Sequence, residues 1–273
     1  MSRSVSEALS APMAGAATAR PAIAVENLVK RYPNGVTAVD GVSFEVAPGT
    51  TCALLGGNGA GKTTTLSMLL GLLLPSSGSI RILGVDMLRH RYRALPRMGF
   101  TSPYVDLPQR LTVIQNLLVY ARLYGVPRPR QRVAELAARL DFESLLKRPY
   151  GSLSAGQRTR VSLAKSLLNE PEVLLMDEPT ASLDPDSADR IRTHLEAYRR
   201  ERGATILLAS HNMQEVERLC RQVLIMRSGR IVARGSPRQL LERFGRETLE
   251  EVFLAISRRE EEGKIPCQAS PPP

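Results

Sequence analysis

The sequence predicts an α/β fold built on a mainly parallel sheet with helices on both faces. Three short apolar runs, at residues 51–55, 173–176 and 204–209, are continuous rather than alternating, which is typical of strands buried on both faces. Each run ends in polar residues suited to phosphate chemistry, and parallel sheets bind ligands at the carboxyl ends of their strands. We therefore expect the three strand ends to form one site.

The first run leads into a glycine-rich loop with the pattern G-x-x-x-x-G-K-[ST], and residues 63–70 then have the pattern of a helix. Backbone N–H groups of such a loop surround phosphate oxygens, and the helix N-terminus adds partial positive charge. We expect Lys62 to reach the β- and γ-phosphates of a nucleotide, and the Thr63 hydroxyl to hold Mg²⁺. The predicted loop contacts are Gly56, Gly57, Asn58, Gly59, Ala60, Gly61, Lys62, Thr63 and Thr64.

The second run ends in Asp177-Glu178, and the third ends in Ser210-His211. At a strand end that faces a phosphate loop, Asp177 is placed to bind Mg²⁺ directly or through water. Glu178 is placed to act as the general base on the attacking water. An isolated acidic pair is more often a solvated strand end, but this pair follows a buried run in a chain with a phosphate loop.

Another segment, residues 153–157 with the sequence LSAGQ, begins a helical pattern that continues to Leu168. Ser154 and Gln157 have the spacing of a capping box, so we expect Ser154 to cap the helix N-terminus. Gly156 lets a ligand approach the backbone, which makes this helix start a second candidate anion site. One nucleotide loop and two anion sites in one chain suggest that two chains share each nucleotide.

Composition and charge limit the classes of protein to which the chain can belong. No segment approaches the roughly 20 continuous apolar residues of a membrane helix, and residues 1–20 have no apolar run of the signal-peptide kind. Three cysteines without metal spacing suit a reducing compartment. The net charge of +10 fits a nucleic acid, an anionic membrane face or acidic partners, but also arginines on solvated faces. Aromatic residues, at 4%, are too few for a single-strand stacking surface.

The LSAGQ segment, the DEPTASLDP stretch at residues 177–185 and the strand ending at His211 together resemble the ATP-binding subunit of an ABC transporter. The resemblance spans about residues 23–253, and it implies ATP and Mg²⁺ as ligands. It also implies an N-terminal antiparallel β subdomain and a helical subdomain inserted at about residues 103–160. The C-terminal part resembles the exporter branch for drugs, polysaccharides and related substrates, whose permease is a separate chain.

The resemblance assigns further roles. Tyr32 resembles the aromatic residue that stacks on adenine, and His211 resembles the switch histidine that hydrogen-bonds the γ-phosphate and the attacking water. The residues expected to contact the γ-phosphate bound by the opposite protomer are Ser154, Gly156 and Gln157. Ser182 and Asp184 resemble the loop that crosses the dimer interface. These assignments imply an ATP-dependent homodimer.

One position departs from the family pattern. The family places a glutamine shortly after a strand such as residues 98–100, where it helps to bind Mg²⁺ and senses the membrane subunit. Alignment on Gly99 puts Pro103 at that position, and Gln109 lies six residues further on. We predict that Gln109 has no direct metal role and belongs to a surface loop that suits permease docking.

The predicted organisation is a disordered tail at residues 1–22, an ATP-binding domain at residues 23–256 and a second disordered tail at residues 257–273. The leading prediction is an ATPase that powers export through a separate permease at the cytoplasmic face of a bacterial inner membrane, with no nucleic-acid partner. One alternative is a soluble ABC ATPase acting on nucleic acid or the ribosome, although the chain lacks a long heptad run, cysteine pairs and a second cassette. The other is a regulator that has lost hydrolysis, against which Glu178 and His211 argue.

Overall fold

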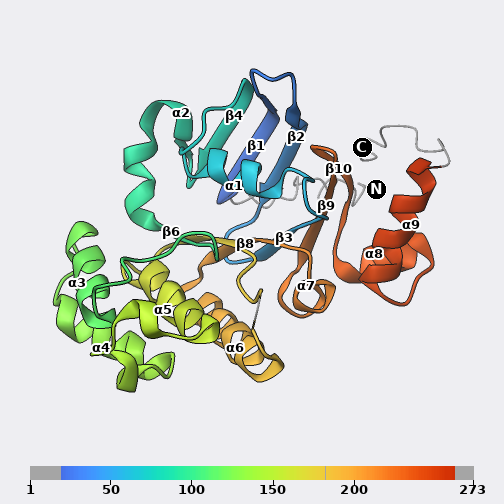
Figure 1. Ribbon diagram of the computed structural model, residues 1–273. Helices are drawn as coiled ribbons and strands as arrows, with labels where there is room; N and C mark the ends of the chain where they lie inside the picture. Colours follow the sequence, from blue (N-terminus) through green and yellow to red (C-terminus); the bar gives the residue numbers. More distant parts are fainter. Residues whose placement is uncertain (1–19, 182, 262–273) are drawn as a thin grey trace, which may run out of the picture.

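The computed structural model describes residues 20–181 and 183–261, which form two sheets surrounded by helices (Figure 1). The larger sheet has the strand order β10-β9-β3-β8-β7-β6, and all neighbours are parallel except β10, which returns antiparallel to β9. This confirms the α/β fold with a mainly parallel sheet, and the three predicted runs are β3, β7 and β8. The strands are β3 Thr51–Leu55, β6 Met98–Thr101, β7 Val173–Asp177, β8 Thr205–Ser210, β9 Gln222–Arg227 and β10 Arg230–Gly235.

The smaller sheet is antiparallel and confirms the expected N-terminal β subdomain. Its strand order is β2-β1-β4-β5, with β1 as Ile23–Arg31, β2 as Thr37–Val46, β4 as Ser77–Ile82 and β5 as Val85–Asp86. The helix that follows the glycine-rich loop, α1 (Lys62–Leu69), lies between the two sheets (Figure 1). Short helices at α2 Met87–His90, η1 Arg91–Arg93 and η2 Leu95–Arg97 connect this sheet to β6.

Alternation along the parallel strands builds two cores, because successive side chains point to opposite faces of a sheet. Leu54 on β3 faces the core shared with α1 and the antiparallel sheet. Its neighbours Ala53 and Leu55 face the core formed with the helices on the other side. Fully burying a leucine side chain contributes about 1.5–3 kcal/mol. The continuous apolar runs in the sequence are therefore a consequence of cores on both faces.

The insertion between β6 and β7 is helical, but less of it is helical than predicted. Residues 103–112 form turns and irregular backbone, and the first helix is α3, Val113–Leu123. Thr112 caps it through a capping box with Gln115. The other elements are α4 Pro129–Arg139, η3 Glu143–Leu145, η4 Tyr150–Ser152 and α5 Ala155–Leu167. Because α5 runs past residue 160 and packs against β6, it joins the insertion to the α/β core.

The C-terminal part consists of β9, β10 and the helices that surround them. It contains α6 Pro185–Arg202, α7 Met213–Leu219, α8 Pro237–Phe244 and α9 Leu249–Glu261. The helix α9 continues to Glu261, past the predicted domain end at residue 256, and the arginine and glutamate residues there favour helix. At the other end, Ala22 is buried and its N–H donates to the Val46 carbonyl at 2.9 Å, so the fold begins before Ile23. The rest of both predicted tails lies outside the described residues.

Candidate functional site

The loop between β3 and α1 has a shape that requires glycine at two positions. A Cβ atom at Gly56 would lie 2.4 Å from the Met226 carbonyl oxygen, and one at Gly61 would lie 2.4 Å from the Ala38 carbonyl oxygen. Gly61 also has a φ of +101°, which side chains rarely allow. The loop backbone can therefore pack tightly against β9 and β2 while it curves around a ligand.

This loop borders a cavity of about 400 Å³. The two acidic residues at the end of β7 line the same cavity, so the ends of β3 and β7 meet there. Register explains this, because β3 and β7 both flank β8 in parallel, with Leu55 opposite Ser210 and Asp177 opposite Ala209. The described lining residues are Val36, Thr37, Ala38, Gly57, Asn58, Gly59, Ala60, Gly61, Lys62, Thr63, Thr64, Tyr104, Asp177, Glu178 and Ser228.

Lys62 lies at the first turn of α1 with its side chain 6% exposed. Its ammonium donates to the carbonyl oxygens of Gly56 at 2.7 Å and Gly57 at 3.2 Å, and it lies 3.8 Å from Oε1 of Glu178. A buried ammonium needs acceptors and a counter-charge. Its three donors suit anionic phosphate oxygens, which would offer both.

Asp177 and Thr63 form a polar pair suited to a divalent cation. The Thr63 hydroxyl donates to Oδ2 of Asp177 at 3.0 Å, and Asp177 is 1% exposed. Burial raises the pKa of Asp177, and the hydrogen bond from Thr63 opposes that shift. Oδ1 of Asp177 is buried and has no hydrogen-bond partner. A buried unpartnered carboxylate oxygen beside a hydroxyl is a donor set that Mg²⁺ accepts.

Glu178 and His211 meet at the carboxyl ends of β7 and β8. Nδ1 of His211 lies 2.8 Å from Oε1 of Glu178, and the His211 backbone N–H donates to Oε2 at 3.4 Å. The Glu178 side chain is 10% exposed, whereas that of His211 is 61% exposed. Glu178 has a φ of +47°, an uncommon value for a residue with a side chain, and its N–H donates to the Ala209 carbonyl. The strained backbone and the histidine together fix the direction of the carboxylate.

Sequence analysis missed Glu215, whose side chain links the end of β8 to the loop that follows β7. Glu215 is fully buried on α7, where its two carboxylate oxygens accept from the hydroxyls of Thr180 and Ser210, each at 2.9 Å. Burial raises the pKa of Glu215, and both hydroxyl contacts lower it. Thr180 follows Glu178 closely in sequence, and Ser210 precedes His211. The sequence signal was an acidic residue on the apolar face of a helix, beside Val216 and Leu219.

The LSAGQ segment starts α5 as predicted. The Ser154 hydroxyl accepts from the Gln157 N–H at 3.3 Å, and Oε1 of Gln157 accepts from the Ser154 N–H at 3.0 Å, which confirms the capping box. Gly156 lies against Leu183, in the loop between β7 and α6. Among the described residues, the cavity beside the glycine-rich loop has no lining contribution from Ser154, Gly156 or Gln157. Within one chain, these residues and the glycine-rich loop do not meet.

Two residues assigned by resemblance have local structural roles. Asp184 caps α6 by accepting from the Ser187 N–H at 3.0 Å, and hydrogen bonding to Ser187 lowers its pKa. Ser182 lies outside the described residues. Tyr32 is 36% exposed at the end of β1, with the Lys30 ammonium 5.4 Å from its ring centre. Tyr32 itself is not among the described cavity-lining residues, although Val36 in the same turn is. The adenine assignment stays a prediction.

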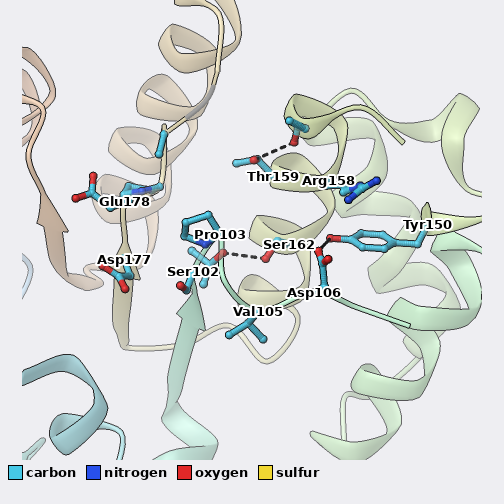
Figure 2. A pocket seen from close by; sticks show the side chains of 14 residues that line it. Ser102, Pro103, Val105, Asp106, Tyr150, Arg158, Thr159, Ser162, Asp177 and Glu178 are labelled. Carbon is cyan, nitrogen blue, oxygen red and sulfur yellow. Dashed lines mark hydrogen bonds between the residues drawn. The ribbon is translucent and has the colours of Figure 1, made fainter. Parts of the chain in front are cut away.

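The loop after β6 borders a second cavity, of about 230 Å³, which also touches Asp177 and Glu178 (Figure 2). Pro103 lies between Glu178 and the α5 residue Ser162 in this view. Gln109 is exposed, and its amide lies 3.5 Å from Asp106. Neither cavity includes Gln109 among its described lining residues. In the described part of the chain, no helix has the length and apolar character needed to cross a membrane.

Comparison with protein families gives one match, to the family described as "ABC transporter", over residues 39–181. Among curated proteins, the chain is 41% identical over 223 residues to a "Nod factor export ATP-binding protein I" of Ralstonia nicotianae, covering 81% of this chain and 69% of that protein. It is 42% identical over 225 residues to the protein of the same name from Paraburkholderia xenovorans, covering 81% and 73%.

Solved structures with the same fold have related titles. One, "Structure of ATP binding subunit of ABC transporter", aligns with a TM-score of 0.79 and 27% identity over 86% of this chain and 99% of that chain. Another is cbiO1 from Clostridium perfringens, described as part of the ABC transporter complex cbiONQ. It aligns with a TM-score of 0.73 and 32% identity over 90% of this chain and 99% of that chain.

Proposed function

The chain belongs to the ABC transporter family, and we propose that it is the ATP-hydrolysing subunit that powers export through a separate membrane permease. The proposal depends on the family match and on one observation above all. Glu178, held by His211 at 2.8 Å, lines the same cavity as the glycine-rich loop and Lys62. A general base beside a phosphate loop is the arrangement that hydrolysis of a nucleoside triphosphate needs.

Each residue at the cavity has a step to perform. The loop N–H groups and Lys62 bind and orient the phosphates of ATP. The Glu178 carboxylate accepts a proton from the attacking water, and His211 keeps that carboxylate in place. Glu215 holds the segments that carry Glu178 and His211 at a fixed separation, through Thr180 and Ser210. General base catalysis typically contributes 10²–10⁴-fold to the rate.

Mg²⁺ is the second ligand in this proposal. Thr63 and Asp177 would hold it, since Asp177 offers a buried oxygen without a partner. The ion would neutralise charge that develops on the phosphates. Mg²⁺ keeps several waters and binds through one or two protein oxygens plus phosphates, so it tolerates the loss of one amide ligand at Pro103. Glu178 and His211 remain to orient the water.

We further propose that two copies of the chain close around two ATP molecules. The support is that Ser154, Gly156 and Gln157 form a capped helix start that contributes nothing to the cavity of their own chain. A helix N-terminus that does not line its own chain's cavity suits the terminal phosphate of a nucleotide held by the opposite copy. Asp184 and Ser182 would lie at the contact between the copies.

The alternative of a nucleic-acid or ribosome ATPase has its support in the net charge of +10. Many arginines, however, pair with carboxylates on the surface. Arg97 contacts Glu172 at 2.5 Å, and Arg202 contacts Glu170 at the same distance. Such pairs reduce the field available to a polyanion. The bacterial relatives are named for export, which favours a place at the cytoplasmic face of the inner membrane, bound through the permease.

The test is co-expression of the chain with a candidate membrane protein chosen from the neighbouring genes, followed by purification in detergent. We expect the two to purify together and to hydrolyse ATP faster than the chain alone. Glu178→Gln is the matched control, because it should keep the complex and lose turnover. Purification of the wild-type chain with ribosomes or nucleic acid, and not with the membrane protein, would contradict the transport role.

A further inference from the structure

The loop after β6 separates the two cavities, and its residues alternate between them. Pro103 and Val105 line the smaller cavity, together with Asp106 (Figure 2). Tyr104, between them, lines the larger cavity beside the glycine-rich loop. Residues 102–105 form a turn, in which the Val105 N–H donates to the Ser102 carbonyl at 3.3 Å, and the two central residues of this turn line different cavities. The side chain at position 103 therefore belongs to one cavity and the side chain at position 104 to the other.

The base of this loop is firmly held, whereas Tyr104 is not. The hydroxyls of Thr101 and Ser162 are buried and lie 2.9 Å apart, which ties the end of β6 to α5. The Ser102 hydroxyl accepts from the Tyr104 N–H at 3.3 Å. The Tyr104 side chain is nonetheless 78% exposed. An aromatic ring exposed at the edge of a polar cavity is available to a ligand that enters it.

The chemistry of the cavity wall indicates which ligand atoms Tyr104 would meet. Tyr104 shares that wall with Asp177 and Glu178, the residues at the metal and water end. Both of these carboxylates are acceptors when ionised, so neither donates to a phosphate oxygen. A phenol hydroxyl is a donor, and hydrogen bonds to an ionised phosphate are the stronger kind. Among the described residues lining this cavity, Tyr104 is the single aromatic one.

From these contacts we infer that Tyr104 is a nucleotide-contacting residue whose hydroxyl donates a hydrogen bond to the terminal phosphate of bound ATP. The inference rests on the proposed function, since it needs ATP in this cavity. Pro103 cannot make this contact, because it has no polar side-chain atom and lines the smaller cavity. ADP lacks the terminal phosphate, so the contact distinguishes the two nucleotides.

The chain has no tryptophan, which allows a direct test. Tyr104→Trp gives a single fluorescent reporter at the site, and Tyr92→Trp is the matched control at a tyrosine that is 75% exposed and does not line the cavity. A non-hydrolysable ATP analogue with Mg²⁺ is titrated at a protein concentration where light scattering shows a monomer. We expect the indole emission of the Tyr104→Trp variant to change with the analogue and to change less with ADP. The emission of the Tyr92→Trp variant should stay constant with both nucleotides.

Tyr104→Phe removes the hydroxyl alone. We expect it to weaken binding of the ATP analogue about tenfold, measured by calorimetry, with ADP affinity unchanged. Tyr92→Phe should leave both affinities at the wild-type value. The inference is overturned if the emission of Tyr104→Trp stays constant, or if Tyr104→Phe binds the analogue as tightly as the wild type does. The proposed function still stands in either case, provided that the wild-type chain binds ATP. Failure of the wild-type chain itself to bind ATP overturns the proposed function, and the Tyr104 contact with it.

Discussion

The carboxyl ends of β3, β7 and β8 and the loop that follows β6 lie at the same edge of one sheet, yet the fold holds them differently. At the three strand ends, Asp177 and Glu215 are buried and each is hydrogen-bonded to hydroxyls from other elements. In the loop after β6, residues 103–106 and Gln109 are exposed. The carboxylates beside the strand ends are thus fixed by the core, whereas the loop is held through its backbone at Gln109 and Leu111 and through the buried Leu107.

This difference in burial fits the family pattern, which the chain keeps at Asp177 and Glu178 and departs from at Pro103. A change at Glu215 would leave the buried hydroxyls of Thr180 and Ser210 without their acceptor, at a cost of about 1–3 kcal/mol each. A change at position 103 disturbs no buried hydrogen bond, since the ties at the base of the loop lie at Thr101 and Ser102. We therefore expect substitutions at the strand ends to have large effects, and substitutions of loop side chains that line neither cavity, such as Gln109, to have small ones.

The largest expected effect is on ATP binding in Lys62→Ala. The substitution removes a buried ammonium that the phosphates would use, while the loop glycines keep their shape. We expect affinity for ATP to fall about 100-fold or more, measured by calorimetry, with an unchanged circular dichroism spectrum. The exposed lysine at Lys147 is the control, and its alanine variant should bind as the wild type does. A folded Lys62→Ala variant that binds ATP with wild-type affinity would show that Lys62 does not bind the phosphates.

A smaller but clear effect is expected on stability in Glu215→Ala. Two buried hydroxyls, those of Thr180 and Ser210, would lose their acceptor. We expect the free energy of unfolding to fall by about 2–3 kcal/mol in urea titrations. Glu242→Ala, which removes an exposed pair with Arg238, should leave the free energy of unfolding close to that of the wild type. Equal effects of the two substitutions would show that Glu215 does not join the strand ends.

The smallest effect is expected in the loop, for Gln109→Ala. Gln109 is exposed, and its amide lies 3.5 Å from Asp106 at the limit of a hydrogen bond. ATP turnover should stay within about twofold of the wild type, because surface substitutions of this kind usually change energies by less than about 0.5 kcal/mol. Turnover as low as that of Glu178→Gln would mean that Gln109 is the family glutamine and that the alignment on Gly99 is wrong.

Much of the structure at the buried strand ends was predictable from the sequence. Continuous apolar runs predicted β3, β7 and β8, because a strand with cores on both faces is apolar along most of its length, and the polar residues of these strands lie at their ends. The capping box at Ser154 was predictable because it is local, requiring two side chains three residues apart. Glu215 was not predicted, since its partners Thr180 and Ser210 come from separate segments that only the fold brings together.

The exposed side was less predictable. Whether Pro103 or Tyr104 faces the nucleotide cavity depends on the path of an irregular loop, and no periodic pattern specifies that path. The helix at α9 extends past the predicted boundary because charged residues with good helix propensity continue it, although they carry no apolar pattern. The segments without a periodic apolar pattern are therefore the ones that the sequence describes least well, and the strands with a core on both faces are the ones that it describes best.

The central claim is that the site of one chain is completed by the LSAGQ helix start of another, and the mass of Glu178→Gln tests it most directly. Replacing the carboxylate by an amide removes the base and keeps the shape, so ATP should bind and persist. With ATP and Mg²⁺, light scattering should give twice the mass of the chain, and Ser154→Arg in the same background should return it to that of a single chain. A Glu178→Gln variant that binds ATP and remains a monomer at high concentration would contradict the claim.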